Sequence, residues 1–204
     1  MMKSVGLLKS SSFDEISQVI NNALKLGSDN NFGHDYLADF ERRFELKIRN
    51  PITTGWERMD DLCKGGLGKS EMGVVIAPTG AGKSMVLVHL GTQALKQGKT
   101  VVHYTLELAD TAVGSRYDSC LTGIPLNDLM INKAEIYDQI QDMEGSLIVK
   151  EYPTKSATTQ TIKNHLERLK KRGIHPDMII VDYADLLRPI KSKSEKRHEL
   201  ETIY

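Results

Sequence analysis

The stretch Ile76-Ala-Pro-Thr-Gly-Ala-Gly-Lys-Ser-Met85 is the most informative segment of this 204-residue chain. It nearly matches the phosphate-binding pattern G-x-x-x-x-G-K-[ST], with Ala77 in place of the first Gly. Gly80 and Gly82 would let the backbone approach a ligand closely, and successive N–H groups of such a loop surround an anion. Ala77 lies before this nest, and its methyl group is tolerable where φ is negative. The stretch therefore predicts a phosphate-binding loop.

Different residues of this loop have different predicted roles in nucleotide binding. Lys83 offers an ammonium to the β and γ phosphates of a nucleoside triphosphate, and the Ser84 hydroxyl completes the Mg²⁺ coordination shell. The helix expected to begin there adds its N-terminal N–H groups. The predicted nucleotide-binding residues are Pro78, Thr79, Gly80, Ala81, Gly82, Lys83 and Ser84.

Strand-like and helix-like segments alternate from about residue 50 onward. Short apolar runs predict strands at 73–77, 100–106, 146–152 and 178–181. Apolar residues at helical spacing predict helices at 84–97, 110–121 and 159–172. The first of these helices is expected to turn inward Val86, Leu87, Leu90 and Ala94, and Asp110 is expected to cap the second. The alternation predicts an α/β domain with a mostly parallel sheet.

Two short amphipathic helices are predicted before this core. Ser12-Phe-Asp-Glu15 has the form of a capping box ahead of an apolar series, and a second apolar series runs from Leu37 to Ile48. Helices this short bury little on each other, so they should pack on the core or on a neighbouring subunit. We expect a helical linker region at 1–49 and the core domain at 50–204, which we expect to be truncated after the strand at 178–182.

The composition indicates neither a membrane protein nor a strongly basic one. Lys plus Arg and Asp plus Glu both number 27, so nucleic-acid binding must rest on local patches. The first residues do not form a signal peptide, and no apolar run reaches the ~20 residues that span a bilayer. Cys63 and Cys120 have no metal-ligand spacing. We therefore expect a cytoplasmic protein without a membrane partner.

Two carboxylates come at the ends of predicted strands, and the carboxyl edge of a parallel sheet faces a ligand crevice. Asp182 follows Met-Ile-Ile-Val, the Walker B arrangement, and would hold Mg²⁺ through water. Glu107 ends the strand after the loop's helix and would orient and deprotonate an attacking water. Plain strand-end acids are the alternative for both. The predicted catalytic residues are Lys83, Glu107 and Asp182, and the predicted metal ligands are Ser84 and Asp182.

Three segments are specific when they are taken together: APTGAGKS (77–84), YTLELADTAVGSR (104–116) and IIVDYADLL (179–187). They resemble the ATPase domain of DnaB-type replicative helicases, a superfamily 4 family with a RecA-like fold. The preceding stretch ITTGWERMDDLCKGGLGKSEMGVVIA (52–77) resembles the entry of that family into its core. The resemblance covers about residues 50–204, and the family also has Ala at the position of Ala77.

The resemblance implies a ring-forming enzyme, a homo-hexamer that binds ATP and Mg²⁺, hydrolyses ATP at subunit interfaces and moves along single-stranded DNA. A primase or a loader is an implied partner. Glu107 matches the catalytic base of the family, Asp182 its Walker B acid, and Arg116 a residue that contacts the nucleotide near its base. Asp185 stands where the family has a Gln that couples phosphate state to DNA contacts. A second metal-side acid is the other interpretation of Asp185.

A basic segment follows the predicted Walker B strand, where RecA-like proteins place loops that line the channel of a ring. Residues 188–198 contain five Lys or Arg against one acid and no aromatic residue. Such a segment can follow a phosphodiester backbone without reading bases. A solvated loop without a partner is the alternative. The predicted DNA-binding residues are Arg188, Lys191, Lys193, Lys196 and Arg197.

Three functions stay open at this stage. The leading one is the ATPase domain of a replicative helicase, which alone should bind ATP, hydrolyse it weakly and unwind nothing, because the arginine finger of the family lies beyond the Walker B strand. The second is a recombinase or clock-type RecA-like ATPase. The third is a nucleotide-dependent assembly module without motor activity, which the neutral net charge favours. Segments 104–116 and 182–187 favour the helicase.

Overall fold

The centre of the fold is a parallel sheet. The structure, a computed structural model, describes residues 16–17, 19–21, 33–41 and 49–189. In these residues the sheet has three strands in the order β2-β1-β3, namely β1 (Thr100–Thr105), β2 (Ser146–Glu151) and β3 (Met178–Asp182). Thr105 pairs with both Glu151 and Asp182, so the carboxyl ends of the three strands meet at one edge. The strands predicted at 100–106, 146–152 and 178–181 are confirmed.

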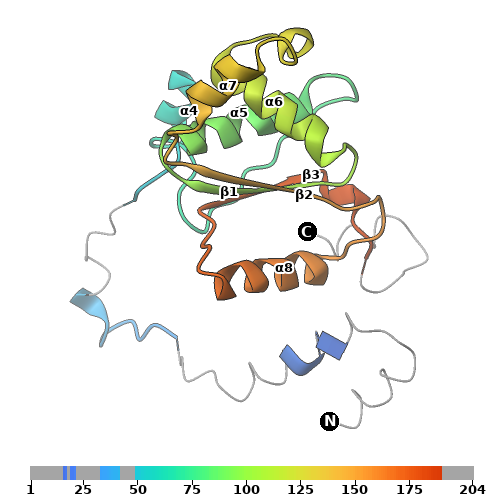
Figure 1. Ribbon diagram of the computed structural model, residues 1–204. Coiled ribbons are helices and arrows are strands. Elements are labelled where there is room, and N and C mark those ends of the chain that lie inside the picture. Colours follow the sequence, from blue (N-terminus) through green and yellow to red (C-terminus); the bar gives the residue numbers. More distant parts are fainter. Residues whose placement is uncertain (1–15, 18, 22–32, 42–48, 190–204) are drawn as a thin grey trace.

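Helices cover both faces of this sheet, as Figure 1 shows. On one face lie α5 (Lys83–Lys96) and α6 (Asp110–Thr122), together with the shorter α4 (Glu57–Leu62) and α7 (Lys133–Ile140). The other face is covered by α8 (Thr159–Lys171). Two short 3-10 helices lie in the connections, η1 (Leu126–Asp128) and η2 (Ala184–Leu186). This is the α/β architecture with a parallel sheet that the alternating pattern predicted.

Two apolar cores lie on the two faces of the central strand β1. Val101 packs toward α5 and α6 with residues that include Val88, Leu95, Val113 and Ile180. Val102 and Tyr104 pack toward α8 with residues that include Leu106, Ile162 and Leu169. Because side chains alternate along a strand, odd-numbered residues of β1 face α5 and α6, and even-numbered residues face α8. A strand buried on both faces reads as a continuous apolar run, which is why β1 was predictable.

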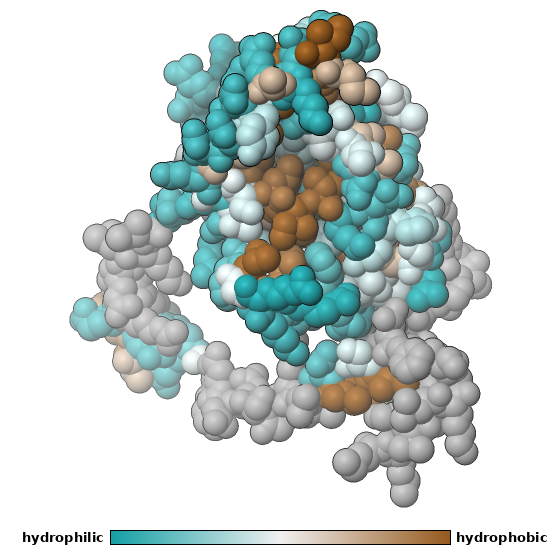
Figure 2. Space-filling model, in the orientation of Figure 1, coloured by the Kyte–Doolittle hydropathy of each residue, from teal (hydrophilic) through white to brown (hydrophobic). Residues whose placement is uncertain are grey.

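The strand β2 forms one edge of the sheet, and its side chains Leu147, Ile148 and Val149 are only partly buried. Figure 2 shows apolar atoms gathered in the middle of the visible face, at the level of the sheet, between polar rims.

The strand predicted at 73–77 is wrong. Those residues form no strand or helix, and Val74 and Ile76 are 57% and 90% exposed. The outer edge of β3 has no partner strand among the described residues, and Ile179 on β3 is 48% exposed. A strand of five residues is stable only when it is paired, so an apolar run alone does not produce one.

Two local predictions about helices also need correction. The buried residues of α5 are Val88, Gly91, Thr92, Ala94 and Leu95, so the inward position of Ala94 is confirmed. Leu87 packs against the core but is only partly buried, as are Val86 and Leu90. The apolar spacing fixed the helix but missed the small residues Gly91 and Thr92 on its inner face. The cap of α6 is Ala109, and Asp110 is its first helical residue. The Asp110 carboxylate accepts from the N–H of Thr111 instead.

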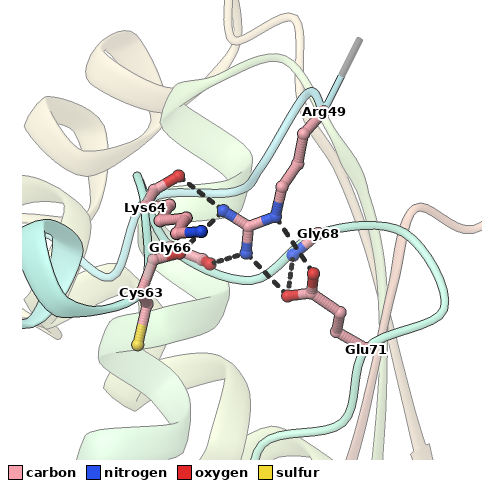
Figure 3. A network of polar contacts seen from close by, with 6 residues as sticks. All are labelled: Arg49, Cys63, Lys64, Gly66, Gly68 and Glu71. Atoms are coloured by element: carbon pink, nitrogen blue, oxygen red, sulfur yellow. Dashed lines mark hydrogen bonds and ion pairs between the residues drawn. The ribbon is translucent and has the colours of Figure 1, made fainter. Parts of the chain in front are cut away.

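An arginine fixes the segment that leads from residue 49 toward the predicted phosphate loop (Figure 3). The Arg49 guanidinium contacts both carboxylate oxygens of Glu71 at 3.0 and 2.7 Å and donates to the carbonyls of Cys63, Lys64 and Gly66. We call these contacts the Arg49 clasp. The planar guanidinium suits such a bidentate contact, and the clasp closes residues 63–71 into a fixed turn.

The two predicted N-terminal helices lie mostly outside the described residues. Residues 16–17, 19–21 and 40–41 are helical, which agrees with the prediction as far as it can be followed. In the part of the chain that the structure describes, no helix is long and apolar enough to cross a membrane.

Candidate nucleotide site

The predicted phosphate loop connects the segment at 73–77 to the N-terminus of α5. Gly80 and Gly82 have φ values of 79° and 92°, and Gly82 is the N-cap of the helix. Positive φ is strained for residues with a Cβ, so the backbone shape itself requires glycine at these two positions. A Cβ at either position would meet no atom within 4 Å. The space beside these glycines suits the close approach of a ligand.

Lys83, the first residue of α5, links the loop to the end of β3. Its Nζ donates to the carbonyl of Ala77 at 3.0 Å and lies 3.5 Å from that of Pro78. The same ammonium lies 5.8 Å from the ring centroid of Tyr183, directly after β3. The predicted loop and the predicted Walker B strand end are therefore adjacent in space.

Asp182 is the most unusual carboxylate among the described residues. It is 1% exposed at the carboxyl end of β3, and neither Oδ1 nor Oδ2 has a hydrogen-bond partner. Its backbone carbonyl accepts from the N–H of Leu106, which holds β1 and β3 in register here. A buried carboxylate without partners is costly unless a cation or a donor compensates it. Hard oxygen ligands of this kind fit Mg²⁺, and Ser84 in the first turn of α5 offers a hydroxyl for the same purpose.

Glu107 lies in the turn that follows β1 and is exposed. The Thr105 hydroxyl donates to the carbonyl of Leu108 at 2.8 Å and accepts from its N–H at 3.1 Å. These two bonds fix the turn that carries Glu107, at the same edge of the sheet as Asp182. A neighbouring acid there, Glu151 at the end of β2, accepts from the N–H of Asp110 and so satisfies a donor at the start of α6.

A buried polar cluster lies on the α5 and α6 face of the sheet. His103 in β1 is 0% exposed, and its Nδ1 lies 2.9 Å from the hydroxyl of Tyr117 on α6. Burial lowers the pKa of His103 to about 4, and the charge of the Asp182 carboxylate opposes this shift. Burial also raises the pKa of the Tyr117 hydroxyl. No metal-ligand spacing in the sequence singles out His103.

The other predicted site residues are less closely grouped. Arg116 is half-buried on α6, one residue before Tyr117. Asp185 lies in η2, and its carbonyl accepts from Nζ of Lys155 at 2.8 Å. Within the described ranges there is no cluster of three or more His, Cys, Asp or Glu side chains that could hold a metal. Of the predicted DNA-binding residues, Arg188 is exposed, and Lys191, Lys193, Lys196 and Arg197 lie outside the described residues.

Comparison with known families identifies the class of protein to which this site belongs. Residues 51–204 match the family model of the DnaB-like helicase C-terminal domain. The chain belongs to this family. It is 28% identical over 209 residues to the DnaB-like replicative helicase of Enterobacteria phage T4, with 92% of this chain and 42% of the relative covered. It is 22% identical over 200 residues to the replicative DNA helicase DnaB of Helicobacter pylori, with coverage of 94% and 38%.

Solved structures agree with the family on the fold. The structure of a DnaB-like replicative helicase that describes its interactions with primase matches with a TM-score of 0.66 and 12% identity, over 99% of this chain and 51% of that one. A second solved structure, of an ATPase domain, matches with a TM-score of 0.66 and 13% identity, over 86% of this chain and 65% of that one. The fold is therefore the RecA-like fold of DnaB-type ATPase domains, as the sequence predicted. The chain spans about two fifths of the length of the curated relatives.

Proposed function

We propose that this chain is the ATP-binding domain of a ring-forming replicative DNA helicase. The observation that carries the proposal is the meeting of two features at one edge of the sheet. One is the glycine loop with Lys83 at the start of α5, and the other is the buried, unpartnered carboxylate of Asp182. The contact between Lys83 and Tyr183 joins the two. Membership of the DnaB-like family supports ATP as the nucleotide.

The loop would bind the phosphates of ATP through backbone N–H groups from Gly80 to Ser84 and through the Lys83 ammonium. Lys83 now donates to the carbonyls of Ala77 and Pro78, so binding would exchange these bonds for bonds to phosphate oxygens. Arg116 is proposed to contact the nucleotide near its base. These contacts orient the γ phosphate at the carboxyl edge of the sheet, where Glu107 lies.

Mg²⁺ would be held by the Ser84 hydroxyl and, through water, by Asp182. When bound, it neutralises charge on the β and γ phosphates. Glu107 is exposed on its fixed turn and is free to approach a water molecule, which it would orient and deprotonate. The cation would supply the partner that the oxygens of Asp182 lack.

The remaining parts of the proposal concern DNA and assembly. Arg188 and the four basic residues of 191–197 would contact the backbone of single-stranded DNA. Residues 1–49 would form a helical linker to a neighbouring subunit of a homo-hexamer, and a primase or a loader would be a partner of the ring. For the 204-residue chain alone we propose ATP binding with weak hydrolysis and no unwinding.

A single-turnover ATPase assay with the 204-residue chain tests the catalytic part. Glu107→Gln should lower the rate of hydrolysis by a factor of about 10² to 10⁴, as expected for loss of a general base, and should leave nucleotide affinity nearly unchanged. Glu144→Gln is the matched control, because it neutralises an exposed acid before β2, at the opposite edge of the sheet. Equal hydrolysis by wild type and Glu107→Gln would exclude Glu107 as the base.

The DNA part is tested by the salt dependence of binding to a single-stranded oligonucleotide. Replacing Arg188 and Lys191 by Ala should weaken binding and flatten the plot of log K against log salt by ~0.7 per lost phosphate contact. Replacing Lys170 and Lys171 by Ala at the end of α8 is the control. If both pairs of substitutions change the slope of log K against log salt equally, the basic segment after β3 is not the DNA-binding segment.

A further inference from the structure

His103 and Asp182 are two buried polar groups on the same face of the sheet, and each has an unsatisfied atom. Nε2 of His103 and both carboxylate oxygens of Asp182 lack a hydrogen-bond partner. Buried polar atoms in native proteins are nearly always paired, with protein or with ordered water. The imidazole of His103 can donate a hydrogen bond and the carboxylate of Asp182 can accept one, so the two unpaired groups point to a partner that they share.

The register of the sheet brings the two groups near each other. His103 pairs with Ile180 and Thr105 pairs with Asp182, so Asp182 is the diagonal neighbour of His103 on the adjacent strand. In a parallel pair with strands ~4.8 Å apart and a rise of ~3.3 Å per residue, such diagonal neighbours lie ~8 Å apart at the backbone.

The direct cross-strand neighbour of Asp182 is not available to it. Thr105 uses its hydroxyl twice, as a donor to the Leu108 carbonyl and as an acceptor from the Leu108 N–H. This leaves His103 as the polar side chain of β1 that faces the Asp182 carboxylate from the same side. Thr92 on α5 is also buried, and its Oγ1 has no partner.

The protonation of His103 follows from its neighbour. A neutral imidazole has one donor nitrogen and one acceptor nitrogen. If the Tyr117 hydroxyl donates to Nδ1, the proton of the ring is on Nε2, the atom that has no partner. Hydrogen-bond donors of this kind orient carboxylates that bind metals. A buried water often bridges two such polar groups.

We propose that His103 is a positioning residue for Asp182: Tyr117 sets the tautomer of His103, and its Nε2–H holds the carboxylate across one buried water in the orientation that receives Mg²⁺. This inference rests on the proposed function, because it concerns the same metal. The proposed contacts link α6, β1 and β3, and they orient a buried carboxylate before any ligand binds.

The test is a Mg²⁺ titration of nucleotide binding by the 204-residue chain, with a fluorescent ATP analogue held at fixed concentration. Against wild type, His103→Leu should raise the half-saturating Mg²⁺ concentration by a factor of about 10 to 100, as for loss of other partners of metal ligands. Analogue affinity in EDTA should be unchanged, because the phosphate loop is intact. His103→Gln, which keeps a donor amide, should give a smaller rise.

The matched control is the second His–Tyr pair, on the opposite face of the sheet. Nδ1 of His165 lies 2.8 Å from the Tyr104 hydroxyl, so His165→Leu breaks the same kind of contact far from Asp182. It should leave the Mg²⁺ dependence unchanged even where it lowers thermal stability. If His103→Leu fails to fold, His103→Gln and Tyr117→Phe test the proposal in its place. Both variants should raise the Mg²⁺ concentration needed for half-saturation.

Three outcomes would overturn the inference. A Mg²⁺ requirement equal to wild type in folded His103 variants would show that the ring only packs. An equal rise in His165→Leu would show a general effect of stability. If wild type binds the analogue without any dependence on Mg²⁺, the proposed metal site itself fails, and the role of His103 fails with it. The first two results leave the proposed function standing, and the third removes its metal site while leaving nucleotide binding by the loop.

Discussion

Gly80 and Gly82 are the residues at which the backbone of the loop departs most from what other amino acids adopt. Because no atom lies near either Cβ position, substitution by Ala tests φ alone. We expect Gly80→Ala and Gly82→Ala each to lower the free energy of unfolding by ~1–2 kcal/mol and to weaken nucleotide binding. Urea denaturation measures the first effect and equilibrium binding of ATP the second.

Gly114→Ala provides the control for that experiment. Gly114 lies inside α6 without a positive φ, and a Cβ there would also meet no atom within 4 Å. The same substitution should therefore raise the free energy of unfolding by ~0.5–1 kcal/mol and leave binding alone. If the two loop variants behave like Gly114→Ala, the loop does not need its left-handed residues.

Gly91 is required for a different reason, which is space. A Cβ at this position of α5 would lie 2.1 Å from the Tyr117 hydroxyl. Gly91→Ala should therefore cost ~1–3 kcal/mol by overpacking, despite the better helix propensity of Ala. Thermal denaturation of Gly91→Ala and of Gly91→Ala/Tyr117→Phe measures this cost. We expect partial recovery in the double variant, because the clashing oxygen is gone while the ring carbons Cε1 and Cζ of residue 117 still lie 2.9 Å from the Cβ position. Equal loss in both variants would contradict this account.

At the scale of elements, the Arg49 clasp should respond to acid. The hydrogen bond from Arg49 lowers the pKa of Glu71 to about 2, from an ordinary value of 4.5. A carboxyl with a lowered folded-state pKa stabilises the fold above its unfolded-state pKa, and this stability is lost as the pH falls through the folded-state value. Wild type should therefore exceed Glu71→Gln in stability at pH 7, and the difference should shrink from about pH 4.5 toward pH 2.

The exposed pair Glu167–Lys170 on α8 is the control for the clasp. It is a single contact of 3.4 Å between two exposed side chains. Glu167→Gln should change little at any pH, because exposed ion pairs contribute little. The clasp account fails if Glu71→Gln and Glu167→Gln show the same pH profile in chemical denaturation. It also fails if Arg49→Lys, which loses the bidentate geometry, is as stable as wild type.

The elements differ in how well the sequence predicted them. The strands β1, β2 and β3 and the helices α5, α6 and α8 have clear patterns, because each has a strongly buried face or a strong boundary such as Gly98 or Gly173. The short helices α4 and α7 were not predicted, since α4 has no buried residue and α7 only Ile136. The strand expected at 73–77 failed because apolar character does not supply a pairing partner.

The candidate site shows the same division. The glycine loop, Lys83 and Asp182 were predictable from local motifs, and the structure places them at one edge of the sheet. The pairing of His103 with Tyr117 was not, because the two residues are 14 positions apart and meet only after α6 packs on β1. No sequence period marks such a contact, although a His in the middle of an apolar strand indicates that a buried partner is needed.

At the scale of the whole molecule, a ligand that binds only the folded chain must stabilise it. ATP with Mg²⁺ at 100 times its dissociation constant should add ~2.7 kcal/mol to the free energy of unfolding, which for a chain of this size raises the Tm by ~5–10 °C. Thermal scans with increasing ATP, with and without EDTA, measure the effect. The chain with Asp182→Asn should gain less from Mg²⁺, because the cation loses a charged partner.

Calorimetric titration of the 204-residue chain with a non-hydrolysable ATP analogue and Mg²⁺ is the direct test of ATP binding by the loop at 77–84. We expect saturable binding by wild type and by Lys96→Ala, at the other end of α5. Lys83→Ala should bind at least about tenfold more weakly, because a charge-assisted hydrogen bond to phosphate is lost. Equal affinity of Lys83→Ala and wild type, or no binding by wild type, would contradict it.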